Sequence, residues 1–504
     1  MFHKKTVPPW PSQPILYEVN TRLWLRELSQ RMGKLITLAN VPVSEIEPWV
    51  GLRFDGIWLM GVWKISRLSQ ATARQERPMA DYRKSLPDLS SPDIMGSPYA
   101  IADYRVEPLL GGEEGLNRFR RLLHEQGLRL VLDFVPNHVA PDHPWLFQHP
   151  DYFIHGTPAE FKAEPENWFR REIRGKLRLY AHGKDPFFPS WRDTAQLNYN
   201  SADLRAAMRQ VLKKISALCD GIRCDMAMLI LTKVFRKGWG ERRWGSRKAI
   251  PHDEFWSGAI SEVRKRSPNF LFLAEAYWGL EWDLQQLGFD YTYDKVLYDR
   301  LRDSDLEGIR KHLRGYLNYQ LHTCRFLENH DEERSATLFG PRSKACALLT
   351  GTVPGMKLFH DGQLEGRKLK VPVQLVRRPG ERRDSDLEQF YTALLKEIST
   401  PIYHEGMWRL LEILPATPED TTHTQLFASV WKKEMALRLS LVNLGKEKAQ
   451  GILTLPTEEF SKGNWLFRDI FSGLQIEKSA SELSQGLAVE LAPYGFHLFE
   501  VTSI

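Results

Sequence analysis

Short apolar segments alternate with amphipathic helical stretches over about the first 400 residues of the chain. Because strands that are apolar throughout are buried on both faces, this alternation is typical of a parallel barrel of eight strands ringed by helices. The predicted fold class is therefore α/β, a (β/α)8 TIM barrel, and DYTYD is the weakest of its strands. The eight segments predicted as strands are ILYEVN (15–20), GIWLM (56–60), LRLVLDFV (128–135), DGIRCD (220–225), FLFLAE (270–275), DYTYD (290–294), CRFLEN (324–329) and MKLFHDG (356–362).

Two connections are too long to be simple loops, and the end of the chain has a different pattern. One connection spans 61–98 and the other, after the third strand, spans 139–199. Loops of this length usually carry function or form small subdomains. After about residue 415, alternating segments separated by turns predict an antiparallel β-domain. The predicted domains are a barrel (1–138 and 201–415), an inserted lid subdomain (139–200) and a C-terminal β-sandwich (424–504).

The composition argues against several classes of function. The net charge of +6 is small for 504 residues, and no arginine stripe or zinc-finger spacing occurs, so we expect no nucleic-acid partner. No apolar run reaches the length of a membrane span, and the first residues, MFHKKTVPPWPSQ, lack the apolar centre of a signal peptide. The four widely spaced cysteines fit free thiols in a reducing compartment. We therefore expect a cytoplasmic protein without membrane contact.

Polar side chains stand where four of the predicted strands end. In a parallel barrel these ends share one rim, which is where the active sites of such folds lie. Taken singly, each has a structural interpretation. Arg223 and Asp225 share one strand face and could form an ion pair, and Asp331 could be a helix N-cap. The full set is Asp133, Asn137 and His138 after the third strand, Arg223 and Asp225 in the fourth, Glu275 after the fifth, and Asn329, His330 and Asp331 after the seventh.

A catalytic role for these polar residues explains their occurrence together better than separate structural roles do. Collecting carboxylates on one rim costs stability unless catalysis or a metal uses them. A metal is the rival explanation, but the spacing lacks the close His, Cys and Asp ligands of a dedicated site. Glycoside hydrolysis requires two carboxyl groups beside the scissile bond, one ionised and one protonated. A neighbouring arginine would favour ionised Asp225, and apolar flanks would raise the pKa of Glu275.

Four segments, DFVPNH, GIRCDMAM, FLAEAYW and FLENHD, occur in the order of the signature regions of the alpha-amylase family of glycoside hydrolases and transglycosylases, and the chain resembles that family over nearly its whole length. The resemblance implies that Asp225 is the nucleophile that forms a covalent glycosyl-enzyme. It implies that Glu275 is the general acid/base and that Asp331 binds sugar hydroxyls and helps to distort the ring. A retaining mechanism follows from these roles.

The resemblance also implies that four residues belong to the substrate-binding site. Arg223 matches the arginine that keeps the nucleophile ionised, and His138 and His330 match histidines that hydrogen-bond the cleaved sugar. Tyr99, in GSPYAIADY, matches a tyrosine that stacks on the same sugar. Aromatic residues in or beside the rim loops are further candidates for sugar contacts: Trp63, Trp145, Phe153, Trp168, Trp191 and Trp278.

The chain departs from the family pattern at positions that bear on calcium and on endo action. Many endo-acting members carry a Lys-His pair where this chain has Met228 and Leu229. Gln196 stands where many relatives have a carboxylate. Asn137 matches a calcium-ligand asparagine, but alone it is expected to stabilise a turn. We therefore expect no cofactor and no bound calcium.

The predicted function is that of a retaining α-glycosidase that acts on α-linked glucosides or α-glucan oligosaccharides. The alternative is a transglycosylase or isomerase, of the glucanotransferase, maltosyltransferase or trehalose-forming type, which would use the same residues and deliver the sugar to an acceptor hydroxyl. A more remote alternative is a non-catalytic binding relative. Such a relative is expected to lack the three carboxylates, which this chain keeps.

Overall fold

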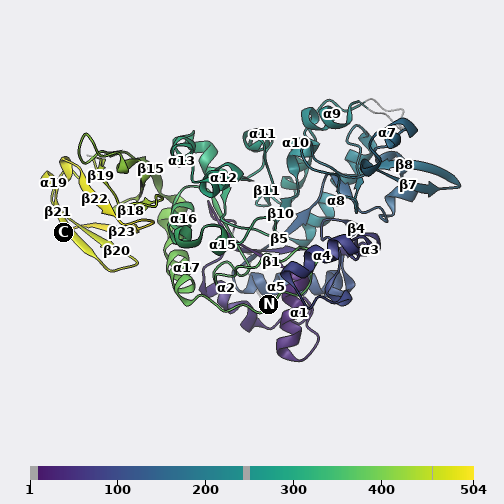
Figure 1. The fold of residues 1–504 in the computed structure, drawn as a ribbon, viewed down its shortest axis with the longest axis horizontal. Coiled ribbons are helices and arrows are strands. Elements are labelled where there is room, and N and C mark those ends of the chain that lie inside the picture. The colour runs from purple at the N-terminus through teal and green to yellow at the C-terminus, as the bar shows by residue number, and fades with distance from the viewer. Residues whose placement is uncertain (1–8, 242–249, 457) are drawn as a thin grey trace.

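The eight predicted strands close into a parallel barrel at the centre of the molecule (Figure 1). The structure, a computed structural model, describes residues 9–241, 250–456 and 458–504; residues 1–8, part of the stretch searched for a signal peptide, lie outside the described residues. The order around the barrel is β1-β14-β13-β12-β11-β10-β5-β2. The strands are β1 (Ile15–Asn20), β2 (Gly56–Met60), β5 (Arg129–Phe134), β10 (Gly221–Cys224), β11 (Leu271–Ala274), β12 (Tyr291–Tyr293), β13 (Thr323–Arg325) and β14 (Met356–His360).

Burial explains why these segments form strands, and the predicted fold class is confirmed. Every residue of β2 and β5 is buried, as expected of strands covered on both faces. The weak strand β12 has three residues and pairs in parallel with β11 and β13, which fix its register. Six Asp, Glu, Lys or Arg side chains are buried within these strands: Glu18 in β1, Arg129 and Asp133 in β5, Arg223 in β10, Arg325 in β13 and Lys357 in β14. The barrel therefore holds charged groups inside the protein.

Amphipathic helices surround the barrel (Figure 1). The hydroxyl of Ser201, for example, caps α8 by accepting a hydrogen bond from Leu204 N at 3.3 Å. No helix in the described part of the chain is both long enough and apolar enough to span a lipid bilayer. The longer helices are α1 (Thr21–Met32), α5 (Gly112–Glu125), α8 (Ala202–Leu218), α10 (Phe255–Arg264), α12 (Lys295–Asp303), α16 (Ser343–Thr352) and α17 (Ser385–Ile398).

The two long connections fold into small structures of their own. The first contains β3 (Trp63–Ile65), α3 (Arg67–Ala73) and α4 (Glu76–Ser85), and β3 pairs with β4 (Ile101–Val106). The second contains the hairpin of β7 (Trp168–Ile173) and β8 (Lys176–Ala181), which extends from the end of the molecule opposite the C-terminal sheets (Figure 1). Its two ends pair with each other as β6 (His138–Val139) and β9 (Ala195–Gln196).

The last part of the chain forms two antiparallel sheets around a shared apolar core. β15 and β16 come from residues that the sequence analysis placed in the barrel domain; they join these sheets because Leu411 and Ile413 are buried in the shared core. These sheets therefore begin before residue 424. One sheet has the order β15-β17-β18-β23-β20-β21 and the other β16-β19-β22. The strands are β15 (Met407–Leu411), β16 (Ile413–Leu414), β17 (Leu426–Lys433), β18 (Ala436–Asn443), β19 (Ala449–Leu453), β20 (Asn464–Asp469), β21 (Gln475–Ser479), β22 (Leu487–Leu491) and β23 (Phe496–Ser503).

Candidate active site

Two of the predicted carboxylates are placed by the ends of neighbouring barrel strands. Asp225 directly follows β10, and its backbone N–H donates to Phe134 O at 2.9 Å. Glu275 directly follows β11, and its N–H donates to Cys224 O at 3.0 Å. The sheet ladder thus continues one residue beyond each strand. Both side chains are held at the C-terminal rim, the face that carries active sites in this fold.

Arg223 joins these carboxylates. Its Nη1 lies 2.8 Å from Asp225 Oδ1, and its Nη2 lies 2.9 Å from Glu275 Oε2. The Arg223 side chain has no exposed surface. Sequence reasoning assigned Arg223 to substrate binding and paired it with Asp225 alone. The structure instead shows a buried cation that holds both carboxylates in place and offers no free face to a ligand.

Aromatic rings enclose the Arg223 guanidinium. Trp58 and Tyr99 each lie with their ring centres 5.3 Å from its central carbon, and Tyr293 lies at 5.5 Å. The Tyr293 hydroxyl also accepts a hydrogen bond from Nε at 3.3 Å. Such rings favour a cation over an uncharged group and keep water away from it. The charge of Arg223 is therefore directed toward the carboxylates.

Glu275 is held by three contacts and has a strongly shifted pKa. Its Oε2 accepts from Met226 N at 2.5 Å as well as facing Arg223, and its Oε1 accepts from the Tyr277 hydroxyl at 2.7 Å. Burial raises the pKa of Glu275 to about 7, with Arg223 opposing the rise. A carboxyl group with that pKa can both donate and accept a proton near neutral pH.

Three buried carboxyl groups share the single guanidinium. Burial raises the pKa of Asp225, and Arg223 opposes this rise. Asp133 Oδ1 lies 4.0 Å from Arg223 Nη1, and burial raises the pKa of Asp133 to about 7. Glu275 and Asp133 each have a pKa of about 7, so they are partly protonated near neutral pH and the cluster titrates as a unit. The site can thus offer an ionised and a protonated carboxyl group together.

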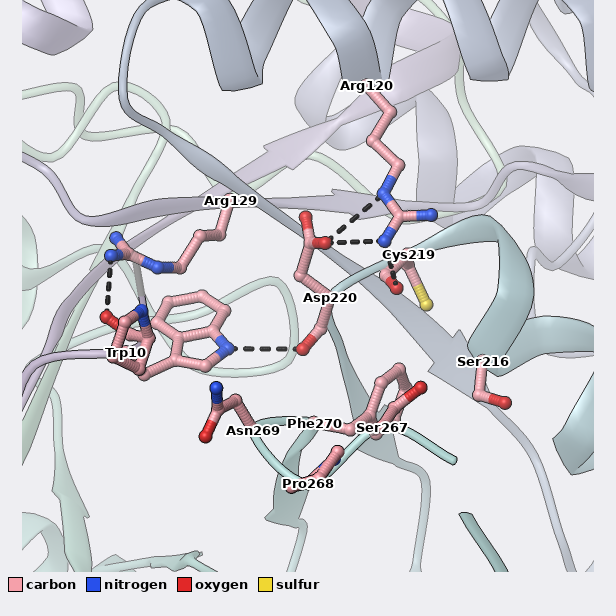
Figure 2. Close-up of a pocket in the computed structure, with 11 residues that line it drawn as sticks. Trp10, Arg120, Arg129, Ser216, Cys219, Asp220, Ser267, Pro268, Asn269 and Phe270 are labelled. Atoms are coloured by element: carbon pink, nitrogen blue, oxygen red, sulfur yellow. Dashed lines mark hydrogen bonds and ion pairs between the residues drawn. The ribbon is translucent and has the colours of Figure 1, made fainter. Parts of the chain in front are cut away.

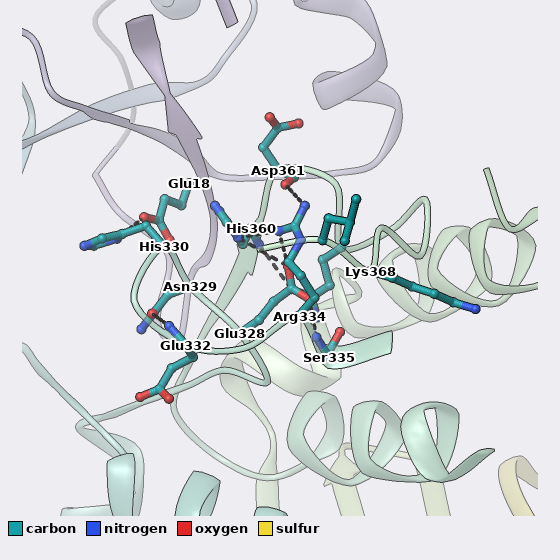
Figure 3. A network of polar contacts seen from close by, with 12 residues as sticks. Glu18, Glu328, Asn329, His330, Glu332, Arg334, Ser335, His360, Asp361 and Lys368 are labelled. Carbon is teal, nitrogen blue, oxygen red and sulfur yellow. Dashed lines mark hydrogen bonds and ion pairs between the residues drawn. The ribbon is translucent and has the colours of Figure 1, made fainter. Parts of the chain in front are cut away.

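His330 links Asp331 to the barrel wall. Its Nε2 lies 3.0 Å from Asp331 Oδ2 and 2.8 Å from the Tyr99 hydroxyl, and its Nδ1 contacts Glu18 of β1 (Figure 3). The rings of Tyr99 and His330 are stacked, with centres 5.2 Å apart. Burial opposes charge on His330, but Asp331 and Glu18 raise its pKa well above the usual range. His330 in turn lowers the pKa of Asp331 against partial burial, so this pair is ionic.

Glu18 is a site residue that sequence reasoning missed. It is fully buried, and its carboxylate fixes His330 from below the rim. The available signal was a charged residue inside the apolar segment ILYEVN. Next to it, Arg334 donates to Glu328 Oε1 at 2.5 Å and to Asp361 O at 2.9 Å (Figure 3), which ties the segment after β13 to the one after β14.

His138 adjoins this group through Tyr99. Its ring hydrogen-bonds the Tyr99 backbone and lies 5.1 Å from the Trp191 ring, centre to centre. Burial lowers the pKa of His138 to about 4, so the imidazole is neutral at physiological pH. Met228 and Leu229, in contrast, are buried in a short 3-10 helix, Ala227–Ile230, and add no polar group. The structure thus brings together all seven predicted site residues, with His138 at the edge.

Asn137 and Gln196 form a closed amide pair beside this site. Gln196 Nε2 donates to Asn137 Oδ1 at 2.9 Å, to Asn137 O at 3.0 Å and to Leu197 O at 3.1 Å. Asn137 Nδ2 donates back to Gln196 Oε1 at 3.2 Å. Within residues 9–241, 250–456 and 458–504, no group of three His, Cys, Asp or Glu side chains is arranged to hold a metal ion.

A cavity lies at the opposite end of the barrel from these residues. It has a volume of about 200 Å³ and lies where β5, β10 and β11 begin (Figure 2). Arg120 Nη2 lies 2.6 Å from Asp220 Oδ1, Trp10 Nε1 donates to Asp220 O at 3.1 Å, and Arg129 donates to Pro9 O at 2.8 Å. These contacts fasten the N-terminal segment across the base of the barrel. Residues at this face of the fold serve stability.

Comparisons with known proteins agree with the fold and with the signature segments. Residues 50–374 match the family model described as "Alpha amylase, catalytic domain". Alpha-amylase 3 of Dictyoglomus thermophilum is 23% identical over 403 residues, which cover 76% of this chain and 70% of that protein. A maltogenic alpha-amylase from Thermotoga neapolitana has the same fold, with a TM-score of 0.66, 18% identity and coverage of 98% and 99% of the two chains.

A transferring relative also matches. The alpha-1,4-glucan:maltose-1-phosphate maltosyltransferase of Burkholderia pseudomallei is 26% identical over 325 residues, which cover 58% of this chain but only 25% of that protein. Alpha-amylase MalA of Haloarcula japonica is 24% identical over 370 residues, and the chain spans 45% of its length. Both longer relatives thus contain large parts that this chain does not match.

Proposed function

Since the chain belongs to the alpha-amylase family, we propose that it is a retaining α-glycosidase that acts on α-linked glucosides or α-glucan oligosaccharides. The observation that carries the proposal is the bridge that Arg223 makes between Asp225 and Glu275, at 2.8 and 2.9 Å. It holds two carboxyl groups close together on one rim, where the proposed roles need Asp225 ionised and Glu275 protonated. Retaining glycoside hydrolysis requires such a pair.

In the first step, Asp225 attacks the anomeric carbon of the bound sugar. The bond from that carbon to the glycosidic oxygen breaks, and Glu275 gives its proton to the departing oxygen. The product is a sugar joined by an ester bond to Asp225, with Glu275 ionised. In the second step Glu275 removes a proton from water, whose oxygen attacks the anomeric carbon and frees Asp225. The pKa of about 7 for Glu275 supports its role in both steps.

The remaining site residues would bind and orient the cleaved sugar. The Asp331 side chain is half exposed, so it can accept hydrogen bonds from sugar hydroxyls. His330 is cationic and lies against the Tyr99 ring, a surface on which a sugar ring can stack. The neutral ring of His138 already hydrogen-bonds the Tyr99 backbone, so at most its other nitrogen can bind a sugar hydroxyl.

A second candidate function is transfer of the sugar to an acceptor hydroxyl instead of water. The observation in its favour is the match to a maltosyltransferase over 325 residues. The steps are the same, except that Glu275 removes the proton from the acceptor.

The test is incubation with α-linked di- and oligosaccharides, with and without phosphate, followed by identification of the products. Shorter sugars alone indicate hydrolysis, and longer or rearranged sugars indicate transfer. A complete lack of turnover on the panel would contradict both candidates and favour a non-catalytic binding role.

We also propose that the fold needs no calcium. The side-chain amide nitrogen of Gln196 lies where several oxygen atoms converge, and its partial positive charge satisfies them. Its Nε2 donates to three oxygens of Asn137 and Leu197, and its side chain is buried. We expect EDTA to leave the melting temperature unchanged. Gln196→Ala should lower the free energy of unfolding by about 1–3 kcal/mol, since buried acceptors lose their donor. A melting temperature that falls with EDTA and recovers with calcium would refute this proposal.

The cysteines support a reducing location such as the cytoplasm. Cys219, Cys224, Cys324 and Cys346 are all buried as free thiols. Buried unpaired thiols are common where disulfides do not form.

A further inference from the structure

Two segments far apart in the sequence meet above one side of the barrel mouth. Residues 88–96 follow α4, and residues 370–378 follow β14. We call this pair of segments the strap. Ile94 and Leu375 form an antiparallel bridge, Met95 N donates to Gln374 O at 2.9 Å, and Val376 N donates to Asp93 O at 2.9 Å. The strap therefore has the backbone pairing of a short sheet.

Side chains fasten the strap. Arg377 donates to both carboxylate oxygens of Asp93, at 3.1 and 2.9 Å, and to both of Asp88, at 3.0 and 2.9 Å. Ile94 and Leu375 are fully buried in a small apolar cluster with residues of α3 and α4. Paired carboxylates, a forked arginine and an apolar core together favour one closed arrangement.

The strap is tied to the helix that follows β1. Asp93 lies 2.8 Å from Arg26 of α1. Arg378 donates to both oxygens of Glu27, also in α1, at 2.8 and 2.7 Å. The strap thus crosses the C-terminal end of β1. Its other end reaches the catalytic rim, where Lys370 donates to the backbone oxygen of Asp331.

The space between the strap and the site is too small for a sugar. The cavity there has a volume of about 30 Å³, and Asn20, Met60, His330 and Lys370 are among the residues that line it. A cavity of this volume holds about two water molecules. A sugar unit attached beyond the one held at His330 would therefore collide with the strap.

The order of the barrel strands shows on which side of the scissile bond the strap lies. β1 lies four strands from β11 in either sense around the ring, so the two are directly opposite. Glu275, which follows β11, protonates the leaving oxygen, and the leaving group must lie on that side. The strap consequently closes the opposite side, where sugar units on the non-reducing side of the scissile bond would continue.

The side nearer β11 has an exposed aromatic surface. Trp278, three residues after Glu275, is 39% exposed, and its ring lies edge-on to the 69% exposed ring of Phe187 at 5.0 Å. Trp282 is also 39% exposed. Trp278 has a φ of 62°, a left-handed conformation that is costly for a bulky residue and that persists where function needs it. Flat aromatic faces can stack on the sugars of a leaving chain.

We propose that the strap restricts the enzyme to chain ends, so that it removes or transfers single glucosyl units from the non-reducing end of α-linked oligosaccharides. This inference rests on the proposed function. The sugar beyond the scissile bond, including the reducing end, extends past Trp278 toward solvent.

The first test uses maltoheptaose labelled at its reducing end. We expect labelled maltohexaose to be the only labelled product shorter than the substrate at early times, accompanied by labelled maltooctaose if the glucosyl unit passes to a second labelled chain instead of water. We also expect a maltoheptaose blocked at its non-reducing end to react at least 100-fold more slowly. Labelled pentaose or shorter labelled sugars in the first products, or equal rates with blocked and free substrates, would overturn the inference while leaving the proposed function intact.

The second test opens the strap. Arg377→Ala removes both carboxylate pairs, and we expect it to raise the rate on blocked maltoheptaose, relative to the free sugar, at least tenfold. The control is Arg383→Ala, which removes an exposed arginine paired with Glu388 nearby and should leave the ratio unchanged. An unaltered ratio in a folded Arg377→Ala protein would count against the strap. A lack of turnover of any sugar by the wild-type protein would refute the proposed function and this inference together.

Discussion

Asp225→Asn and Glu275→Gln are each expected to lower turnover by orders of magnitude while leaving the fold intact. Loss of a general acid/base usually costs about 10²–10⁴ in rate, and loss of the nucleophile should cost at least as much because the two groups act as a unit. Both amides retain the shape of the carboxyl group and can remain near Arg223. The measurements are kcat/KM on a cleaved oligosaccharide and melting of each variant.

The pH profile and the leaving group separate the two roles. Because Glu275 must be protonated to act as the acid, its pKa of about 7 should produce an alkaline limb near that pH, and Glu275→Gln should abolish it. An aryl glucoside with a good leaving group needs little protonation, so it should recover activity in Glu275→Gln during the first step but not in Asp225→Asn. Glu333→Gln, an exposed neighbour on the rim, is the matched control. Activity within tenfold of wild type would remove either residue from its role.

Arg223→Met is expected to lower both turnover and stability. The substitution leaves Asp225 and Glu275 buried without their cation, and breaking a buried ion pair typically costs about 3–5 kcal/mol. Arg223 is the largest influence that lowers the pKa of either group, so both pKa values should rise without it. Since Asp225 must be ionised and Glu275 protonated, the acidic and alkaline limbs of the pH–rate profile should both move to higher pH.

Two measurements distinguish this role from that of a simple structural ion pair. Melting reports the lost stability, and turnover per folded molecule across pH reports the lost electrostatics. Arg223→Lys keeps the positive charge but lacks the forked guanidinium that reaches both carboxylates. The limbs of its pH–rate profile should therefore lie near those of the wild type, while its melting temperature stays lower. If Arg223→Met melts early yet keeps wild-type turnover and an unmoved acidic limb, the ion pair is only structural.

The barrel could be predicted from sequence because its signal is local. Each strand is a short apolar run, and even the three-residue β12 was detectable between its flanking aspartates. The assignment of β15 and β16 to the C-terminal sheets could not be predicted from the local sequence. Residues 407–414 follow the last helix of the barrel without a strong break, and their membership in the C-terminal sheets depends on pairing with β17 and β19. Such pairing is invisible in a single segment.

The candidate site was predictable in its residues but not in its connections. Arg223 and Asp225 lie two positions apart, so their pairing could be read from strand periodicity. The contact of Arg223 with Glu275 crosses between two strands, and the contact of Glu18 with His330 joins residues 312 positions apart in sequence. Sequence spacing alone cannot place such groups beside each other. The apolar flanks of Glu275 predicted its raised pKa, but nothing in the sequence indicated that burial raises the pKa of Asp133 as well.

The pairing of β6 with β9 has a consequence for how this protein can change over evolutionary time. His138 lies opposite Gln196, so the insertion leaves the barrel and returns to it at a single point. A segment attached in this way can be lengthened, shortened or replaced without moving the barrel strands. Its sequence can therefore diverge faster than the rim that it overhangs. Related chains can thus acquire new preferences through the insertion while the same carboxylates perform the chemistry.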